Sequence, residues 1–441
     1  MLNLAFLLLF FFTPLMTWYL LRIAGDRINQ ISALNITTLS IYTFSVIGLF
    51  PLFYKMDAYR VAIGITNANL VFVVLLCSTI SIFMFLLGAI FVRRVLHWTP
   101  YPVLSRKIQP LKQLNHFGLL VFFSIVIVTF LLYLSKIDQI AILVALKEGP
   151  EAAVLARSNM GNNFDKLHRY SLILNNLGTL VTLAFFSLWL MKKKFIRFML
   201  FLISFSLSGA VAVMATEKAP FINLLMALFI TYYLVKKDGF IPKRHVIIFV
   251  LISFLALILF YIYFMGSRDI YSATMSILSR TFSGSIAPAY FYLEYVPHIK
   301  DYYWFRTFPN PGGILPFEPV RYTVDIMNHT LPQNLEQGII GSMPTVFWGE
   351  AYLNFGFFGI PIISFIMGCF VATISHLISR IQPNSVSIAF TVWMIFHLKS
   401  LSITGFSNYL YDFYIIFITT ITLIILSLTT KLKLNKVDKV Y

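Results

Sequence analysis

The sequence predicts an all-α, polytopic integral membrane protein with about eleven transmembrane helices and one long extracytoplasmic loop. Of the 441 residues, 59% are hydrophobic and only 12% are charged, whereas a soluble domain usually carries about 25% charged residues. The apolar residues also form long blocks that are almost free of charge, such as 69–92 and 246–266. A helix of about 20 apolar residues spans the ~30 Å hydrocarbon core of a bilayer, whereas a membrane β-barrel would show short alternating segments.

The first apolar block, 2–21, has no basic residue before it and is followed by Arg22. A signal peptide has the opposite arrangement, so we interpret this block as a retained first helix. The other predicted spans are 36–54, 69–92, 117–135, 171–191, 198–215, 219–235, 246–266, 352–379, 386–404 and 409–430. We treat residues 1–430 as a single transmembrane domain, followed by a basic tail at 431–441.

The distribution of Lys and Arg predicts the orientation of the chain. If the basic tail lies in the cytoplasm, the cytoplasmic loops carry twenty basic and three acidic residues, and the opposite side carries fourteen of each. This is the orientation that the positive-inside rule favours, and an odd number of spans then places the N-terminus outside. The net charge of +17 therefore requires no nucleic acid as a partner.

Two predicted outer loops are long, at about 136–170 and about 267–351. Loops of more than about 12–15 residues are uncommon unless they are functional or disordered. The second loop is rich in aromatic residues, which is not typical of disorder. We therefore expect it to contain short helices that lie against the membrane surface.

Several classes of chemistry lack their sequence signatures. Cys77 and Cys369 both lie in apolar blocks, which predicts neither a disulfide framework nor a zinc site. No H-E-x-x-H pattern and no Walker loop occurs. The sequence thus predicts no metal and no bound cofactor, and leaves the charged residues of the outer loops as the candidates for function.

The first candidates are basic residues suited to anion binding. Arg157 and Arg169 lie in the first outer loop, and Glu217 and Lys218 form a turn that precedes Pro220. The planar guanidinium binds phosphate through two hydrogen bonds, and a helix N-terminus attracts anions. The alternatives are a solvated surface helix in the loop and a Glu–Lys surface pair in the turn.

The second outer loop adds Arg268, Arg280, Arg321 and His329. Arg280 lies in a strongly apolar stretch, where an arginine is costly without a partner. That partner could be a structural ion pair or a phosphorylated ligand.

Glu350 lies at or near the start of a predicted span, within the distinctive segment 344–359. It could cap the helix dipole or act as a catalytic base. Near the outer ends of the last two spans, Lys399 and Asp412 are expected to form an ion pair, although intramembrane charges are also functional candidates.

Four of these features resemble the Wzy-type, or O-antigen, polymerases of bacterial surface polysaccharides. They are the number of helices with a large outer loop near the C-terminal third, the loop around Arg157 and Arg169, the basic turn at Lys218, and the segment 344–359. The likeness covers most of the chain. Family members often carry Thr-Arg at the turn where this sequence has Glu217-Lys218.

The resemblance implies a membrane glycosyltransferase of the bacterial inner membrane, with a periplasmic N-terminus and a cytoplasmic C-terminus. It would bind two undecaprenyl-diphosphate-linked oligosaccharides and transfer the growing chain onto a new lipid-linked repeat unit. Undecaprenyl diphosphate would be the leaving group. The resemblance also suggests a chain-length-regulating co-polymerase as a partner.

On this hypothesis, the acceptor hydroxyl needs a base, and the departing diphosphate needs positive charge. Glu350 is the first candidate for the base, followed by His329 and Glu217. The residues assigned to diphosphate or glycan contact are Arg157, Arg169, Lys218, Arg268, Arg280 and Arg321.

Three alternatives remain open: an O-antigen ligase of similar topology, a polysaccharide flippase or other transporter, and a non-catalytic scaffold of a glycan assembly complex. Transporters usually place charges near the bilayer midplane. Here the charges cluster at the predicted outer surface, which favours an enzyme over a transporter.

Overall fold

The computed structural model describes residues 1–98, 108–149, 172–216, 218–264, 269–333 and 341–428, together with residues 152, 156, 160 and 170. Within these ranges, eleven helices are long and apolar enough to cross a membrane. The described part of the chain is helical apart from turns, loops and one isolated bridge between Gln30 and Phe240. The prediction of an all-α, multi-pass membrane protein is therefore confirmed.

The long helices agree with the predicted spans to within a few residues at most ends. They are α1 (Leu2–Ile23), α2 (Ala33–Tyr42) continued by η1 (Thr43–Ile47) and α3 (Leu49–Phe53), α5 (Ala68–Val95), α6 (Gln113–Leu134), η2 (Leu172–Leu177) continued by α10 (Gly178–Met191), α11 (Phe195–Met214), α12 (Lys218–Lys236), α13 (Lys243–Phe264), α18 (Phe347–Arg380), α19 (Ser385–Lys399) continued by η5 (Ser400–Ser402), and η6 (Phe406–Tyr409) followed by α20 (Phe413–Ser427).

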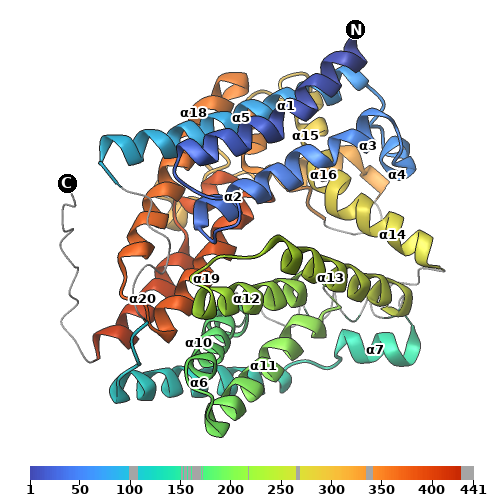
Figure 1. The fold of residues 1–441 in the computed structure, drawn as a ribbon. Coiled ribbons are helices and arrows are strands. Elements are labelled where there is room, and N and C mark those ends of the chain that lie inside the picture. The colour runs from blue at the N-terminus through green and yellow to red at the C-terminus, as the bar shows by residue number, and fades with distance from the viewer. Residues whose placement is uncertain are drawn as a thin grey trace.

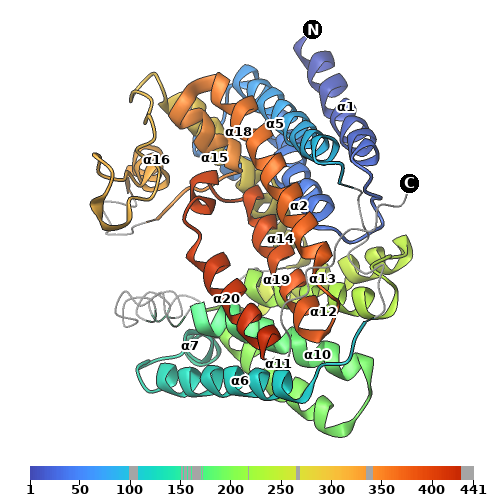
Figure 2. The ribbon, with the colours of Figure 1, turned by 90° about the vertical axis from the view of Figure 1, so that its left-hand side faces the viewer.

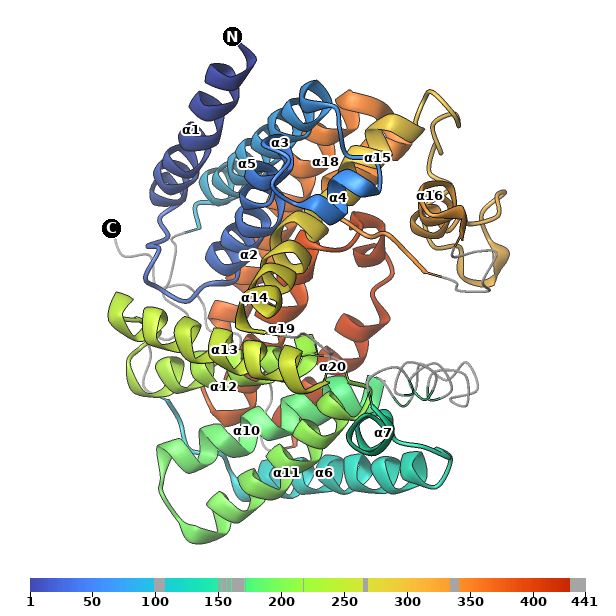
Figure 3. The same cartoon turned by 90° about the vertical axis from the view of Figure 1, so that its right-hand side faces the viewer.

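Short helices lie between these spans, as expected for the long loop. They are α4 (Ala58–Ala62), α7 (Ala141–Glu148), α14 (Ile270–Leu278), η3 (Ser279–Ser283), α15 (Gly284–Tyr295), η4 (Pro311–Gly313) and α16 (Tyr322–Thr330). The segment around α16 lies at the edge of the molecule, beyond α15 (Figures 2 and 3). The surface helix considered for the first outer loop falls largely outside the described residues.

The long helices form two groups (Figure 1). One contains α1, α2, α5 and α18, and the other contains α6, α10, α11, α12 and α13. Helix α19 lies between the groups and packs on both α2 and α10. This central position makes α19 a structural link between the two groups.

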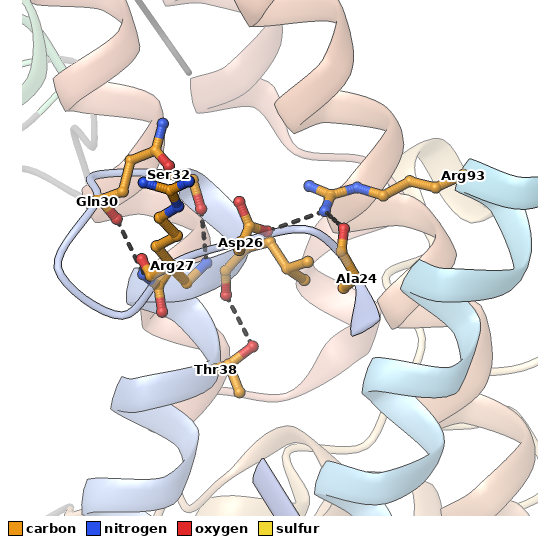
Figure 4. Close-up of polar contacts among 9 residues, drawn as sticks. Ala24, Asp26, Arg27, Gln30, Ser32, Thr38 and Arg93 are labelled. Atoms are coloured by element: carbon orange, nitrogen blue, oxygen red, sulfur yellow. Dashed lines mark hydrogen bonds and ion pairs between the residues drawn. The ribbon is translucent and has the colours of Figure 1, made fainter. Parts of the chain in front are cut away.

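Loops predicted on the same side of the membrane contact one another. At the end that we call the basic end, Ile31 N donates to Gly239 O at 2.9 Å and Gln109 N donates to Pro383 O at 2.8 Å. Arg93 Nη1 bonds both Ala24 O and Asp26 Oδ2 there (Figure 4). The opposite end, which we call the long-segment end, carries residues 54–67, 269–333 and 403–412. These contacts therefore agree with the predicted alternation of the loops between the two sides of the membrane.

Helices α5 and α18 pack closely through glycines. A Cβ atom added to Gly88 would collide with the backbone of Phe365, and one added to Gly368 would collide with the backbone of Phe85. Ser81 and Ser364 share a hydrogen bond of 2.9 Å across the same interface. Small residues allow this approach in membrane helices.

Helix α18 is broken at Gly356, whose φ of 65° and ψ of −157° are non-helical. That backbone conformation is essentially restricted to glycine. A Cβ atom there would also lie 3.0 Å from Tyr302 Oη. The break separates the helical turns 347–355, which carry Glu350, from the rest of the helix. The predicted span 352–379 therefore begins too late. The turns 347–355 lie among the segments of the long loop, so the sequence did not mark them as the start of the helix.

Candidate functional site

Glu350 lies in the first turn of α18 and is buried, with 1% of its surface exposed. Its Oε2 atom accepts a hydrogen bond of 3.0 Å from Ser407 N, while Oε1 has no hydrogen-bond partner among the described residues. A Cβ atom on Gly405 would collide with both Glu350 Oε2 and Tyr322 Oη. Because Gly405 has no side chain, the Glu350 carboxylate and the Tyr322 phenol can both lie against it.

Neighbouring polar groups tie two distant segments to the start of α18. Asn354 Nδ2 donates to Thr307 Oγ1 at 2.7 Å and to Glu350 O at 3.0 Å. Phe305 N donates to Asn354 Oδ1 at 2.9 Å. Buried polar groups are costly unless they are hydrogen-bonded, so these contacts hold residues 305–307 and 405–407 against the start of α18.

Two tyrosines complete the Glu350 centre. Tyr292 Oη donates to Met343 O at 2.6 Å. Burial, and secondly the negative charge of Glu350, raise the pKa of both Tyr292 and Tyr322 well above the ordinary value. Both phenols therefore remain protonated donors at neutral pH. In this conformation the surrounding protein encloses Glu350. The carboxylate is therefore well placed to hold neighbouring segments together.

A second cluster brings together two arginines that are far apart in the sequence. Arg60 lies on α4 and Arg280 on η3, and Asp57 connects the two elements. Asp57 accepts hydrogen bonds from Ser279 Oγ at 2.6 Å and from Arg60 N at 3.3 Å. Burial lowers the pKa of Arg60; Asp57 opposes this effect, and the nearby charge of Arg280 adds to it. The positive charges of Arg60 and Arg280 are thus close enough to repel each other.

Within the described part of the chain, Arg60 has a buried donor without a partner, and Arg280 is exposed beside Tyr261. Arg60 Nε is buried and has no hydrogen-bond partner among the described residues. Arg280 is exposed, and its guanidinium lies 6.0 Å from the centre of the Tyr261 ring. No carboxylate of the described chain forms an ion pair with Arg280. The cluster therefore has excess positive charge and free donor capacity.

The expected ion pair between Lys399 and Asp412 is wrong. Asp412 Oδ2 instead bonds His397 Nε2 at 2.5 Å, and Lys399 Nζ donates to Asn223 Oδ1 at 2.8 Å. Side chains two positions apart on a helix point in different directions. His397 therefore faces α20, while Lys399 faces α12.

The other predicted site residues lie away from these clusters or outside the described part of the chain. Arg321 immediately precedes α16, and His329 lies near its end; both are exposed. The His329 ring lies 5.0 Å from the Tyr295 ring. Only the backbone of Lys218 is described, at the start of α12. The predicted residues outside the described part of the chain are Arg157, Arg169, Glu217 and Arg268.

Sequence reasoning missed Arg60, Tyr322 and His397. Arg60 lies in a short loop on the predicted outer side, so the orientation of the spans could have drawn attention to it. His397 is a titratable residue inside a predicted span, which is also a signal. Tyr322 gives no signal in the sequence, since only the fold brings its phenol to Glu350.

Within the described ranges, no group of three or more His, Cys, Asp or Glu side chains could hold a metal ion. Comparison of the chain with models of known protein families found no match, and comparisons with curated proteins and with solved structures found none either.

Proposed function

We propose that this protein polymerises undecaprenyl-diphosphate-linked oligosaccharide repeat units into a surface polysaccharide at the outer face of a bacterial inner membrane. The growing chain moves from its lipid carrier onto a sugar hydroxyl of a new lipid-linked unit, and undecaprenyl diphosphate leaves. The bond to the diphosphate is already activated, so the transfer needs no further energy source.

The observation that carries this proposal is the pair Arg60 and Arg280 at the long-segment end. A diphosphate would bind both guanidinium groups and offset their mutual repulsion. Positive groups that are held in place before the reaction stabilise the negative charge of a leaving group without reorganisation. The arginine pair thus supplies what departure of a lipid diphosphate requires.

The surroundings of Arg280 also suit a lipid-linked substrate. Its guanidinium lies beside Tyr261 of α13. Most residues of α13 are not buried in the protein, so most of this helix would face lipid. A polyprenyl tail could lie along α13 while its diphosphate reaches Arg280 at the end of the helix.

The proposal can be tested by deleting the gene and separating the surface polysaccharide on a gel, in a Gram-negative host. A polymerase predicts that the long ladder is lost while core carrying a single repeat unit remains. Core without any repeat unit would contradict a polymerase and indicate a ligase or a flippase.

Complementation of the deletion strain then tests the arginine pair. We expect Arg60→Ala and Arg280→Ala to shorten or abolish the ladder at normal protein level, because each removes a phosphate ligand. Arg94→Ala is the matched control, since Arg94 is an exposed arginine at the opposite, basic end. A normal ladder in the double variant R60A/R280A would show that this pair does not bind the substrate.

A further inference from the structure

The last two spans meet at a histidine–carboxylate pair at the long-segment end. His397 lies near the end of α19, and Asp412 precedes α20. The side chains are 19% and 8% exposed, respectively. Asp412 uses its two oxygens differently: Oδ2 contacts His397 Nε2, and Oδ1 accepts a hydrogen bond of 3.0 Å from Ile415 N. The carboxylate is therefore fixed by the helix that it caps.

The imidazole is also held by its own neighbours. The Trp393 ring lies 5.0 Å from it at an angle of 17°, and Trp393 Nε1 donates to Asn176 Oδ1 at 3.1 Å. Tyr409 Oη donates to His397 O at 2.8 Å. These contacts come from η2, α19 and the turn before α20, so the ring orientation does not depend on a ligand.

The contact with Asp412 also sets the tautomer. An ionised carboxylate only accepts hydrogen bonds, so Nε2 carries the proton and Nδ1 carries the lone pair. Nδ1 makes no hydrogen bond with the described residues. The pair thus has the elements of a general base: an orienting carboxylate, a fixed ring and an unoccupied basic nitrogen.

We propose that His397 is the general base of the transfer reaction and that Asp412 positions it; this inference rests on the proposed function. His397 Nδ1 takes the proton of the acceptor hydroxyl as that oxygen bonds to the anomeric carbon of the growing chain. The bond from this carbon to the diphosphate breaks, and its electron pair leaves with undecaprenyl diphosphate. Asp412 stabilises the imidazolium, which then releases its proton to water.

The geometry favours His397 over Glu350 and His329, while Glu217, the third base expected from the sequence, lies outside the described residues. Glu350 is 1% exposed and its Oε2 atom is already bonded to Ser407 N. His329 is exposed, and no carboxylate of the described chain pairs with it. The turn from Gly405 to Tyr409 links the two centres, because Ser407 bonds Glu350 and Tyr409 bonds His397. Glu350 therefore acts as a positioning residue for the turn that supports His397.

The test uses the full-length protein in lipid nanodiscs, with a purified undecaprenyl-diphosphate-linked repeat unit as the probe for both binding and transfer. We expect His397→Gln to lower the transfer rate by about 10²–10⁴-fold while binding of the lipid-linked unit stays within about two-fold. His376→Gln is the matched control, since His376 lies in α18 towards the basic end. It should transfer at the wild-type rate.

Asp412→Asn separates a chemical role from a structural one. Asparagine is as good an N-cap as aspartate, so α20 should remain intact. The titratable groups around the ring are Asp412, Tyr409 and Tyr414. Asparagine carries no charge to stabilise the imidazolium, so the transfer rate of Asp412→Asn should fall while its binding of the lipid-linked unit stays within about two-fold of the wild type.

Two results would overturn the assignment: a wild-type transfer rate in His397→Gln, or a wild-type transfer rate in Asp412→Asn. A different result bears on the proposed function itself. If the wild-type protein binds the lipid-linked unit but never extends it, the polymerase proposal fails, whatever the His397 variants do.

Discussion

At the scale of single residues, Glu350 illustrates how a buried carboxyl group can organise a membrane protein without facing solvent. Its carboxylate connects α18 to the turn before α20 through Ser407, and to α16 through the space that it shares with Tyr322. An isolated buried charge is costly, but removal of one partner from a buried set is also costly because the others lose their bonds. Glu350 therefore stabilises the protein by holding these segments in place.

Replacement of Glu350 tests this role. We expect Glu350→Ala to lower the stability of the purified protein by about 1–3 kcal/mol, because Ser407 N loses its acceptor. Glu350→Gln keeps a carbonyl oxygen at this position and should be clearly less destabilising. Thermal unfolding in detergent measures both variants. Equal melting temperatures for the wild type and Glu350→Ala would contradict a structural role for the carboxylate.

The pair of His397 and Lys399 shows why residue identity alone did not predict the contacts here. Both lie at the same end of α19, and an ion pair between Lys399 and Asp412 was a reasonable expectation. The direction in which each side chain leaves the helix decides the partner. Asp412 therefore bonds the histidine, and Lys399 bonds Asn223 of α12.

At the scale of elements, the interface of α5 and α18 depends on the absence of side chains. The backbones approach so closely at Gly88 and Gly368 that a single methyl group has no space. In lipid, helix association depends on close packing rather than on the hydrophobic effect. This interface therefore supports the position of the part of α18 that follows Gly356.

We expect Gly368→Ala to destabilise the protein by about 1–3 kcal/mol, because overpacking forces the two backbones apart. Gly209→Ala is the matched control in α11, where the added Cβ would meet only a side-chain atom of Phe221 at 3.8 Å. Melting temperatures in detergent compare the two. An unchanged value for Gly368→Ala would mean that the helices are less closely packed than the structure shows.

Non-α-helical turns accompany the candidate sites. The π-helical segment η3 carries Arg280, and η2 carries Asn176, which bonds Trp393 beside His397. Such segments are rare and often occur at functional sites. They change the direction of the side chains that follow, so a sequence pattern with a period of 3.6 residues does not reveal which groups they bring together.

At the scale of the whole molecule, the two ends of the helix bundle differ in chemistry. The basic end carries Arg93 paired with Asp26, whereas the long-segment end carries the Glu350 centre, the arginine pair and His397. The positive-inside rule predicts that the basic end is cytoplasmic. The proposed function requires this orientation, because lipid-linked repeat units are polymerised outside.

Labelling of single cysteines in intact spheroplasts tests the orientation. In a variant without Cys77 and Cys369, we expect Lys300→Cys to react with a membrane-impermeant maleimide, because Lys300 belongs to the long-segment end. Lys193→Cys, at the opposite end, should react only after the membrane is permeabilised. The reverse pattern would invert the topology and exclude an extracytoplasmic site at Arg280 or His397.

The sequence by itself determined the membrane class, the eleven spans and the two ends, because these depend on local hydropathy and on the summed charge of each loop. It also identified Glu350 and Arg280 as notable, since a charge in an apolar setting stands out without knowledge of its neighbours. Only the tertiary structure decided the partners: Arg60 with Arg280, Tyr322 with Glu350, and His397 with Asp412. Each pairing joins residues of different elements. The direction in which each side chain leaves its helix also decides that Asp412 meets His397 rather than Lys399. No local pattern of residues therefore specifies these partners.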